Sequence, residues 1–73
     1  MAVSNWAVVE RSDFADGTHR EVRMSPTGLV LVEDRLYDGT FRATRITVDG
    51  RVLQEFGNTS TEAWRKTQRA ANA

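Results

Sequence analysis

The chain has 73 residues, with ten basic and ten acidic side chains and no cysteine. A chain this short forms one domain with little apolar surface to bury, and the lack of cysteine excludes disulfides and thiolate zinc sites. The zero net charge argues against a general polyanion binder, because such proteins usually carry a clear positive excess.

The chain also lacks the sequence features of export and membrane insertion. No apolar run approaches the roughly 18 residues that span a bilayer, and residues 1–6 lack the basic and apolar blocks of a signal peptide. We therefore expect residues 1–73 to form a single cytoplasmic domain with no membrane partner. A composition rich in Arg, Ala, Val, Asp and Gly, with a single Lys, suggests a GC-rich coding source such as a bacterium or a phage.

Turn signals punctuate most of the chain. Asp-Gly pairs at 16–17, 38–39 and 49–50, together with Ser25-Pro26-Thr27-Gly28, predict four turns. The segments around these turns predict five strands, at about 5–12, 19–24, 29–37, 41–48 and 51–56. Connections this short predict an antiparallel meander.

The last quarter of the chain predicts a helix over about 60–71. Thr59 and Glu62 form a capping box at its start. An apolar stripe follows at helical spacing, made of Ala63, Trp64, Thr67, Ala70 and Ala71. An isolated helix of this length is marginal, so it must dock on the sheet with Trp64 as a lid. The predicted fold class is α+β: a five-stranded antiparallel β-meander, open or curled, with one C-terminal helix on one face.

Two-residue loops at Asp38-Gly39 and Asp49-Gly50 would fix the register of the sheet. They would place Ile46 opposite both Leu31 and Leu53. The helix is then expected on the face that carries Phe41 and Phe56. The other face is left as the expected partner interface, formed by Val22, Met24, Leu29, Leu31 and Ile46.

The residues carry no recognisable catalytic constellation. His19 has Ser12, Asp13 and Asp16 near it in sequence, but the spacing matches no triad or metal motif, so we interpret it as a surface histidine. We expect no cofactor, no metal and no small-molecule substrate. The sequence favours a non-enzymatic protein-interaction module of regulator or inhibitor type, which binds either a second copy of itself or a larger protein.

The alternative is a nucleic-acid-binding module that uses the cationic flank of the helix, Arg65, Lys66 and Arg69.

In addition, the Asp49-Gly50 hairpin followed by the helix start at 59–64 resembles the small N-terminal arm-binding domains of tyrosine recombinases, over residues 41–71. Those domains are strongly basic and have three strands, whereas this chain is neutral with five predicted strands, so we do not assign it to that family.

Overall fold

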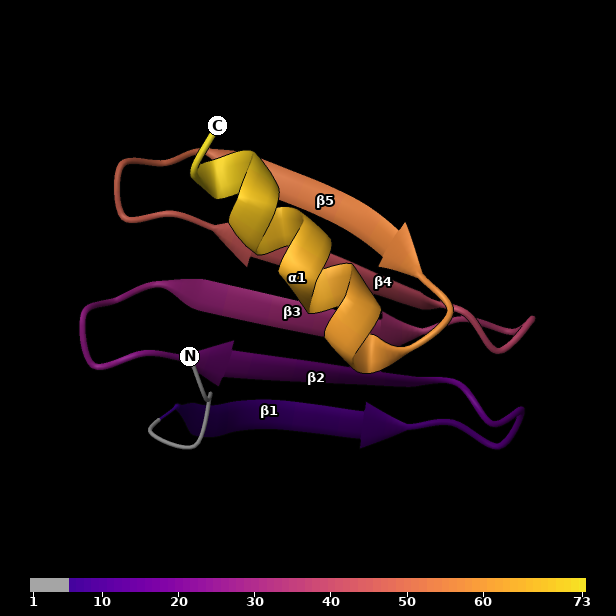
Figure 1. The fold of residues 1–73 in the computed structure, drawn as a ribbon. Coiled ribbons are helices and arrows are strands. Elements are labelled where there is room, and N and C mark those ends of the chain that lie inside the picture. The colour runs from indigo at the N-terminus through magenta and orange to yellow at the C-terminus, as the bar shows by residue number, and fades with distance from the viewer. Residues whose placement is uncertain (1–5) are drawn as a thin grey trace.

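A computed structural model describes residues 6–73 as an open five-stranded sheet with one helix lying across it (Figure 1). The elements are β1 (Ala7–Asp13), β2 (His19–Met24), β3 (Val30–Arg35), β4 (Phe41–Ile46), β5 (Val52–Gly57) and α1 (Ser60–Ala71). Each strand pairs antiparallel with the next, so the predicted α+β meander is confirmed. The sheet is open rather than closed into a barrel, with β1 and β5 at its edges. The predicted start of the first strand, at residue 5, lies outside the described residues.

All four turns have the same geometry, which sets the register of the whole sheet. In the turn between β3 and β4, Gly39 N donates to Leu36 O at 2.9 Å and Leu36 N donates to Thr40 O at 2.8 Å. This is a three-residue loop, in which a type I turn is followed by a residue in the left-handed region. That residue is a glycine in every turn, with φ from 86 to 91° at Gly17, Gly28, Gly39 and Gly50.

The three-residue loops overturn the predicted register, which assumed loops of two residues. Ile46 lies opposite Val30 and Val52, not opposite Leu31 and Leu53. Because side chains alternate along a strand, a shift of one residue moves every side chain of the neighbouring strand to the other face. The predicted composition of the two faces was therefore wrong.

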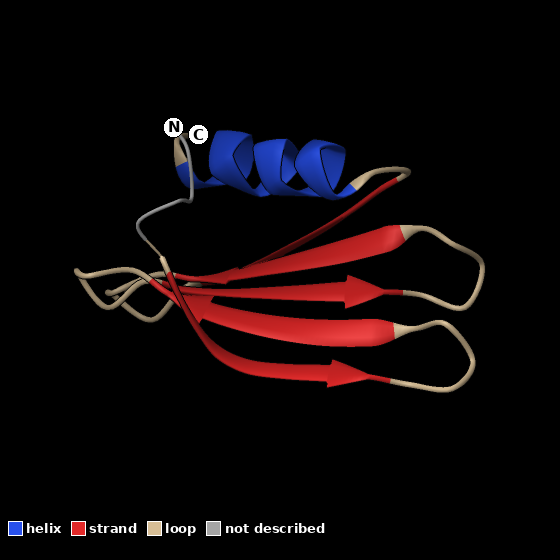
Figure 2. Ribbon diagram, turned by 90° about the horizontal axis from the view of Figure 1, so that it is seen from below, coloured by secondary structure: helices blue, strands red, loops and turns tan. Residues whose placement is uncertain are grey.

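Residues that pair across strands share a face, so the observed register sorts the side chains. The side that faces α1 carries Leu31, Phe41, Ala43 and Leu53. The other side, here called the open face, carries Phe56 together with six aliphatic residues described below. The helix thus covers the face with Phe41, as predicted, but Phe56 lies on the opposite face. Figure 2 shows α1 on one side of the sheet and no other helix or strand on the far side within residues 6–73.

The helix begins where the sequence predicts. Thr59 is the N-cap, and its side chain accepts a hydrogen bond from Glu62 N at 3.1 Å. The Glu62 carboxylate lies 3.5 Å from Lys66 Nζ instead of completing the reciprocal half of the capping box. From this start α1 runs over β4 and β5, and Trp64 reaches β3, where its Nε1 donates to Glu33 Oε1.

The hydrophobic core beneath the helix is small. Among the described residues, only Leu31, Ala43 and Ala63 are buried hydrophobic side chains. Thr67 lies fully buried beside them, and its hydroxyl donates to Trp64 O at 2.7 Å. One large aliphatic side chain and two alanines are little apolar volume, so this domain has a thin margin of stability as a single chain.

Candidate functional site

The open face carries a continuous apolar surface. Val22 lies beside Val32, and the next row across the sheet pairs Met24 with Val30. The surface has six members in total, here called the apolar patch: Val22, Met24, Val30, Val32, Ile46 and Val52. None of the six is buried, and Met24 and Val52 are 42% and 63% exposed.

The helix side of the sheet has a different character where α1 does not cover it. Over β1 and β2 it is charged: Glu21 Oε1 lies 2.9 Å from Arg11 Nη1, and Glu21 Oε2 lies 2.5 Å from Arg23 Nε. Burial raises the pKa of the Glu21 carboxyl, but hydrogen bonds from the two arginines outweigh it and hold the pKa below its usual 4.5. Over β1 and β2 the helix side of the sheet is therefore mainly charged, although Val8 is an exposed apolar side chain there.

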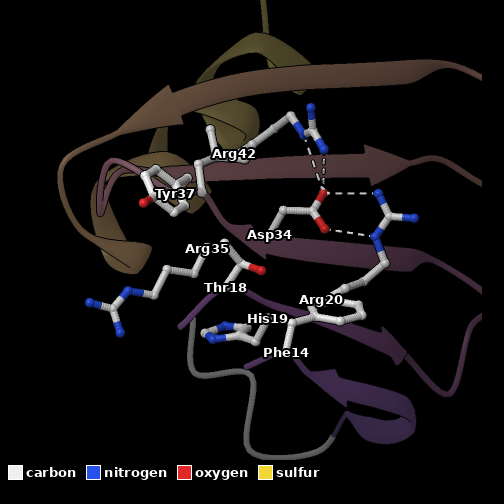
Figure 3. Close-up of a pocket in the computed structure, with 9 residues that line it drawn as sticks. Phe14, Thr18, His19, Arg20, Asp34, Arg35, Tyr37 and Arg42 are labelled. Atoms are coloured by element: carbon white, nitrogen blue, oxygen red, sulfur yellow. Dashed lines mark hydrogen bonds and ion pairs between the residues drawn. The ribbon is translucent and has the colours of Figure 1, made fainter. Parts of the chain in front are cut away.

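One end of the open face carries an ion triad (Figure 3). The Asp34 carboxylate accepts from Arg20 Nε at 2.6 Å and from Arg42 Nη2 at 3.0 Å. Burial raises the pKa of Asp34, yet the hydrogen bonds from both guanidinium groups outweigh it, so the pKa lies below its usual 3.8. The triad follows from the observed register, in which Arg20, Asp34 and Arg42 lie side by side across β2, β3 and β4.

A hollow of about 360 Å³ lies beside this triad, between the β1–β2 and β3–β4 turns (Figure 3). Phe14 and Tyr37 line it, and Tyr37 is 83% exposed. His19, on the same lining, has its Nε2 atom 2.9 Å from Glu33 Oε2, a partner that the sequence did not indicate. The neighbours expected for His19 are engaged elsewhere, because Asp13 pairs with Arg11 and Asp16 with Thr18.

The predicted partner interface is only partly assembled. Val22, Met24 and Ile46 lie together on the open face. Leu31 does not, since it is 2% exposed under the helix, and Leu29 lies in the β2–β3 turn, outside the strands. Sequence reasoning missed the patch members Val30, Val32 and Val52, which it had placed on the opposite face. The turn type would have identified these residues, because the loop length sets the register and the register decides which face each side chain lies on.

The cations proposed for nucleic-acid contact do not form one free cluster. Arg65 and Arg69 are exposed on α1. Lys66 is engaged, because its Nζ donates to Phe56 O at 2.8 Å and lies near Glu62. Most of the other arginines also have partners. Besides those already described, Arg45 Nε donates to Thr67 Oγ1, and Nη2 of Arg51, which precedes β5, donates to Ala71 O.

Other kinds of site have little support in residues 6–73. No three His, Asp or Glu side chains of this stretch are grouped so that they could hold a metal ion. Its single helix lacks the length and apolar character needed to cross a membrane. No family model matches the chain, and neither does any curated protein or solved structure.

Proposed function

We propose that this protein is a non-enzymatic interaction module of regulator or inhibitor type that binds another protein through the open face. The observation that carries the proposal is the apolar patch, which lies on the one face that α1 leaves uncovered. Contiguous exposed apolar surface beyond a few hundred Å² is uncommon on monomeric proteins and marks interaction sites. Binding would bury these aliphatic side chains and thereby supply the free energy of association.

The chemistry of the patch favours a protein over a nucleic acid. Its six members are aliphatic, and they offer neither aromatic rings for base stacking nor donors for phosphate. The nearest cations, Arg20 and Arg42, already share the Asp34 carboxylate. An apolar protein surface is the complementary partner for such a face.

A position-specific crosslinking experiment tests the proposal. A photo-crosslinking amino acid replaces Val32 at the centre of the patch, and in a matched control it replaces Val8, which is 54% exposed on the helix side of the sheet. In cells that express the protein, position 32 should form covalent adducts with protein, whether a second copy or another chain, and position 8 should not. Equal adducts from both positions, or none from position 32, would contradict the proposal.

Nucleic-acid binding by the helix is a second candidate, favoured by the exposure of Arg65 and Arg69 on α1. A complex held by phosphate contacts weakens steeply as salt rises. Fluorescence anisotropy with labelled DNA and RNA, at low and high salt, measures this dependence for the wild type and for Arg65→Glu combined with Arg69→Glu. If the wild type binds and the double variant does not, the helix candidate replaces the open face as the leading function.

A further inference from the structure

We infer that the partner of the open face is a second copy of this chain, and that two sheets pack face to face as a homodimer. This inference rests on the function proposed above, because it names the occupant of the same face. It also states how the two copies are oriented.

The first support is the small core. A domain whose buried hydrophobic residues are Leu31, Ala43 and Ala63 gains little stability from its own interior. Small domains without disulfides or metals commonly gain the missing stability by oligomerisation. A second copy is the one partner that is present whenever the chain is made, and the zero net charge removes long-range repulsion between copies.

The second support is that both edges of the sheet are poor sites for adding strands. At one edge, β1 contains a bulge at Val9, between the paired residues Val8 and Glu10. A bulge of this kind interrupts the row of hydrogen-bonding groups and twists the edge. At the other edge, Lys66 Nζ donates a hydrogen bond to the carbonyl oxygen of Phe56 on β5, which makes this acceptor unavailable to an added strand. Each edge therefore carries one obstacle to strand pairing, which favours association through the open face.

The face is also large enough. Five strands about 4.8 Å apart and six residues rising about 3.3 Å each give an outline of roughly 24 by 20 Å. The whole molecule, with its turns and helix, extends over 34 × 24 × 21 Å. This outline has a projected area of about 480 Å². The accessible surface of its side chains is larger than the projection and so comes nearer the roughly 800 Å² per partner that stable interfaces bury.

Charge selects between two ways of stacking the faces. The two copies are related by a two-fold axis that lies between the two sheets. If this axis ran parallel to β3, Arg20 would face Arg42 of the partner subunit, and Asp34 would face its own copy. Like charges would then meet in a desolvated interface, which is unfavourable.

An axis that runs across the strands avoids that conflict. This axis is placed between two neighbouring rows of the open face, one with Val22 and Val32 and one with Met24 and Val30. Each row of one subunit then packs on the other row of the partner subunit. Each strand then lies over its own copy in the opposite direction. Arg42 then approaches the partner's β4–β5 turn instead of the partner's Arg20, so the two Arg20–Asp34–Arg42 triads no longer face each other. This orientation packs apolar rows on apolar rows, as in a β-sandwich.

Two measurements on the purified protein test the inference. Light scattering across a range of concentrations should give twice the 8.2 kDa of one chain. Val32→Glu should weaken the dimer on the order of 100-fold or more, because it buries an unpaired charge, whereas Val8→Glu on the helix side should not. A wild type that is monomeric at every concentration overturns the homodimer. In that case, adducts from position 32 with a different protein would still support the proposed function.

The second measurement does not depend on a destabilising variant. Because the chain has no cysteine, Val52→Cys provides a single thiol at the edge of the patch. With the axis across the strands, the two β5 strands lie over each other about 10 Å apart, the usual spacing of packed sheets. With the axis along β3, each β5 strand would lie over β1 of the other copy. The two β5 strands would then be separated by four strand spacings, or about 19 Å, in the plane of the sheet. A short bis-maleimide should therefore link Val52→Cys into covalent dimers, and a dimer of normal mass that fails to link overturns this orientation.

Discussion

The indole Nε1 of Trp64 donates a hydrogen bond to Glu33 Oε1 at 3.3 Å, and this contact ties the helix to the central strand of the sheet. The same carboxylate accepts from the Ser60 hydroxyl in the first turn of α1, and its Oε2 lies 2.9 Å from His19 Nε2 on β2. One carboxylate therefore joins α1, β2 and β3. The Glu33 side chain is only 15% exposed, so its partners have limited access to water as a replacement.

We expect Glu33→Ala to lower the free energy of unfolding by about 1–3 kcal/mol, because it leaves the Trp64 N–H and its neighbours without their acceptor. Glu55→Ala is the matched control: Glu55 lies on the same face, on β5, and has no side-chain hydrogen bond or ion pair to any described residue. Urea denaturation followed by tryptophan fluorescence measures both. Equal losses in the two variants would show that Glu33 is not a tie between helix and sheet.

The positions of the elements could be predicted from the sequence because their signals are local. The Thr59 cap, the glycines of the turns and the alternating strands each depend on a few neighbouring residues. The register could not be read from Asp-Gly alone, because a two-residue loop and a three-residue loop both place glycine at a positive φ. The resulting error of one residue exchanged the two faces.

A decisive signal was nevertheless present in the proline turn. Pro26 stands two residues before Gly28, at the second position of a type I turn, where a φ near −65° is required. Ala15, Tyr37 and Val48 stand at the equivalent positions before their glycines. Applying the geometry of the proline turn to all four loops would have given three-residue loops and the observed faces.

The contacts around Glu33 were beyond sequence reasoning for a different reason. His19, Ser60 and Trp64 lie 14, 27 and 31 residues away along the chain. Which side chains converge on this carboxylate depends on register and helix placement together. The apolar patch has the same dependence, which explains why Val22, Met24 and Ile46 were found and Val30, Val32 and Val52 were missed.

The Asp34 triad predicts a specific dependence of stability on pH. The pKa of Asp34 lies below 3.8 in the folded protein, so its contribution is fully present above that value and is lost as the pH falls through the folded pKa. We expect Asp34→Asn to lower the free energy of unfolding by about 1–3 kcal/mol at neutral pH, since Arg20 and Arg42 lose their shared charge partner. The gap between variant and wild type should close on acidification.

Urea denaturation at a series of pH values from neutral to strongly acidic measures this gap. Asp13→Asn is a suitable control, because the pKa of Asp13 is also lowered, by its hydrogen bonds from Arg11, but the side chain is 65% exposed. Its effect should be much smaller at every pH. A constant difference between Asp34→Asn and the wild type across the whole range would refute the electrostatic origin of the effect.

The junction between β5 and α1 requires glycine for a steric reason. A Cβ atom on Gly57 would lie 2.7 Å from the backbone N of Ala63 and 3.0 Å from Glu62 Cβ. The nearer of these contacts is to helix backbone, so Gly57→Ala must displace the first turn of α1 and weaken its packing on the sheet. We expect a loss of about 1–3 kcal/mol in the free energy of unfolding. Asn58→Ala, at the exposed next position, serves as the control, and urea denaturation compares the two. If Gly57→Ala were as stable as that control, the helix start would have to sit farther from β5 than the structure places it.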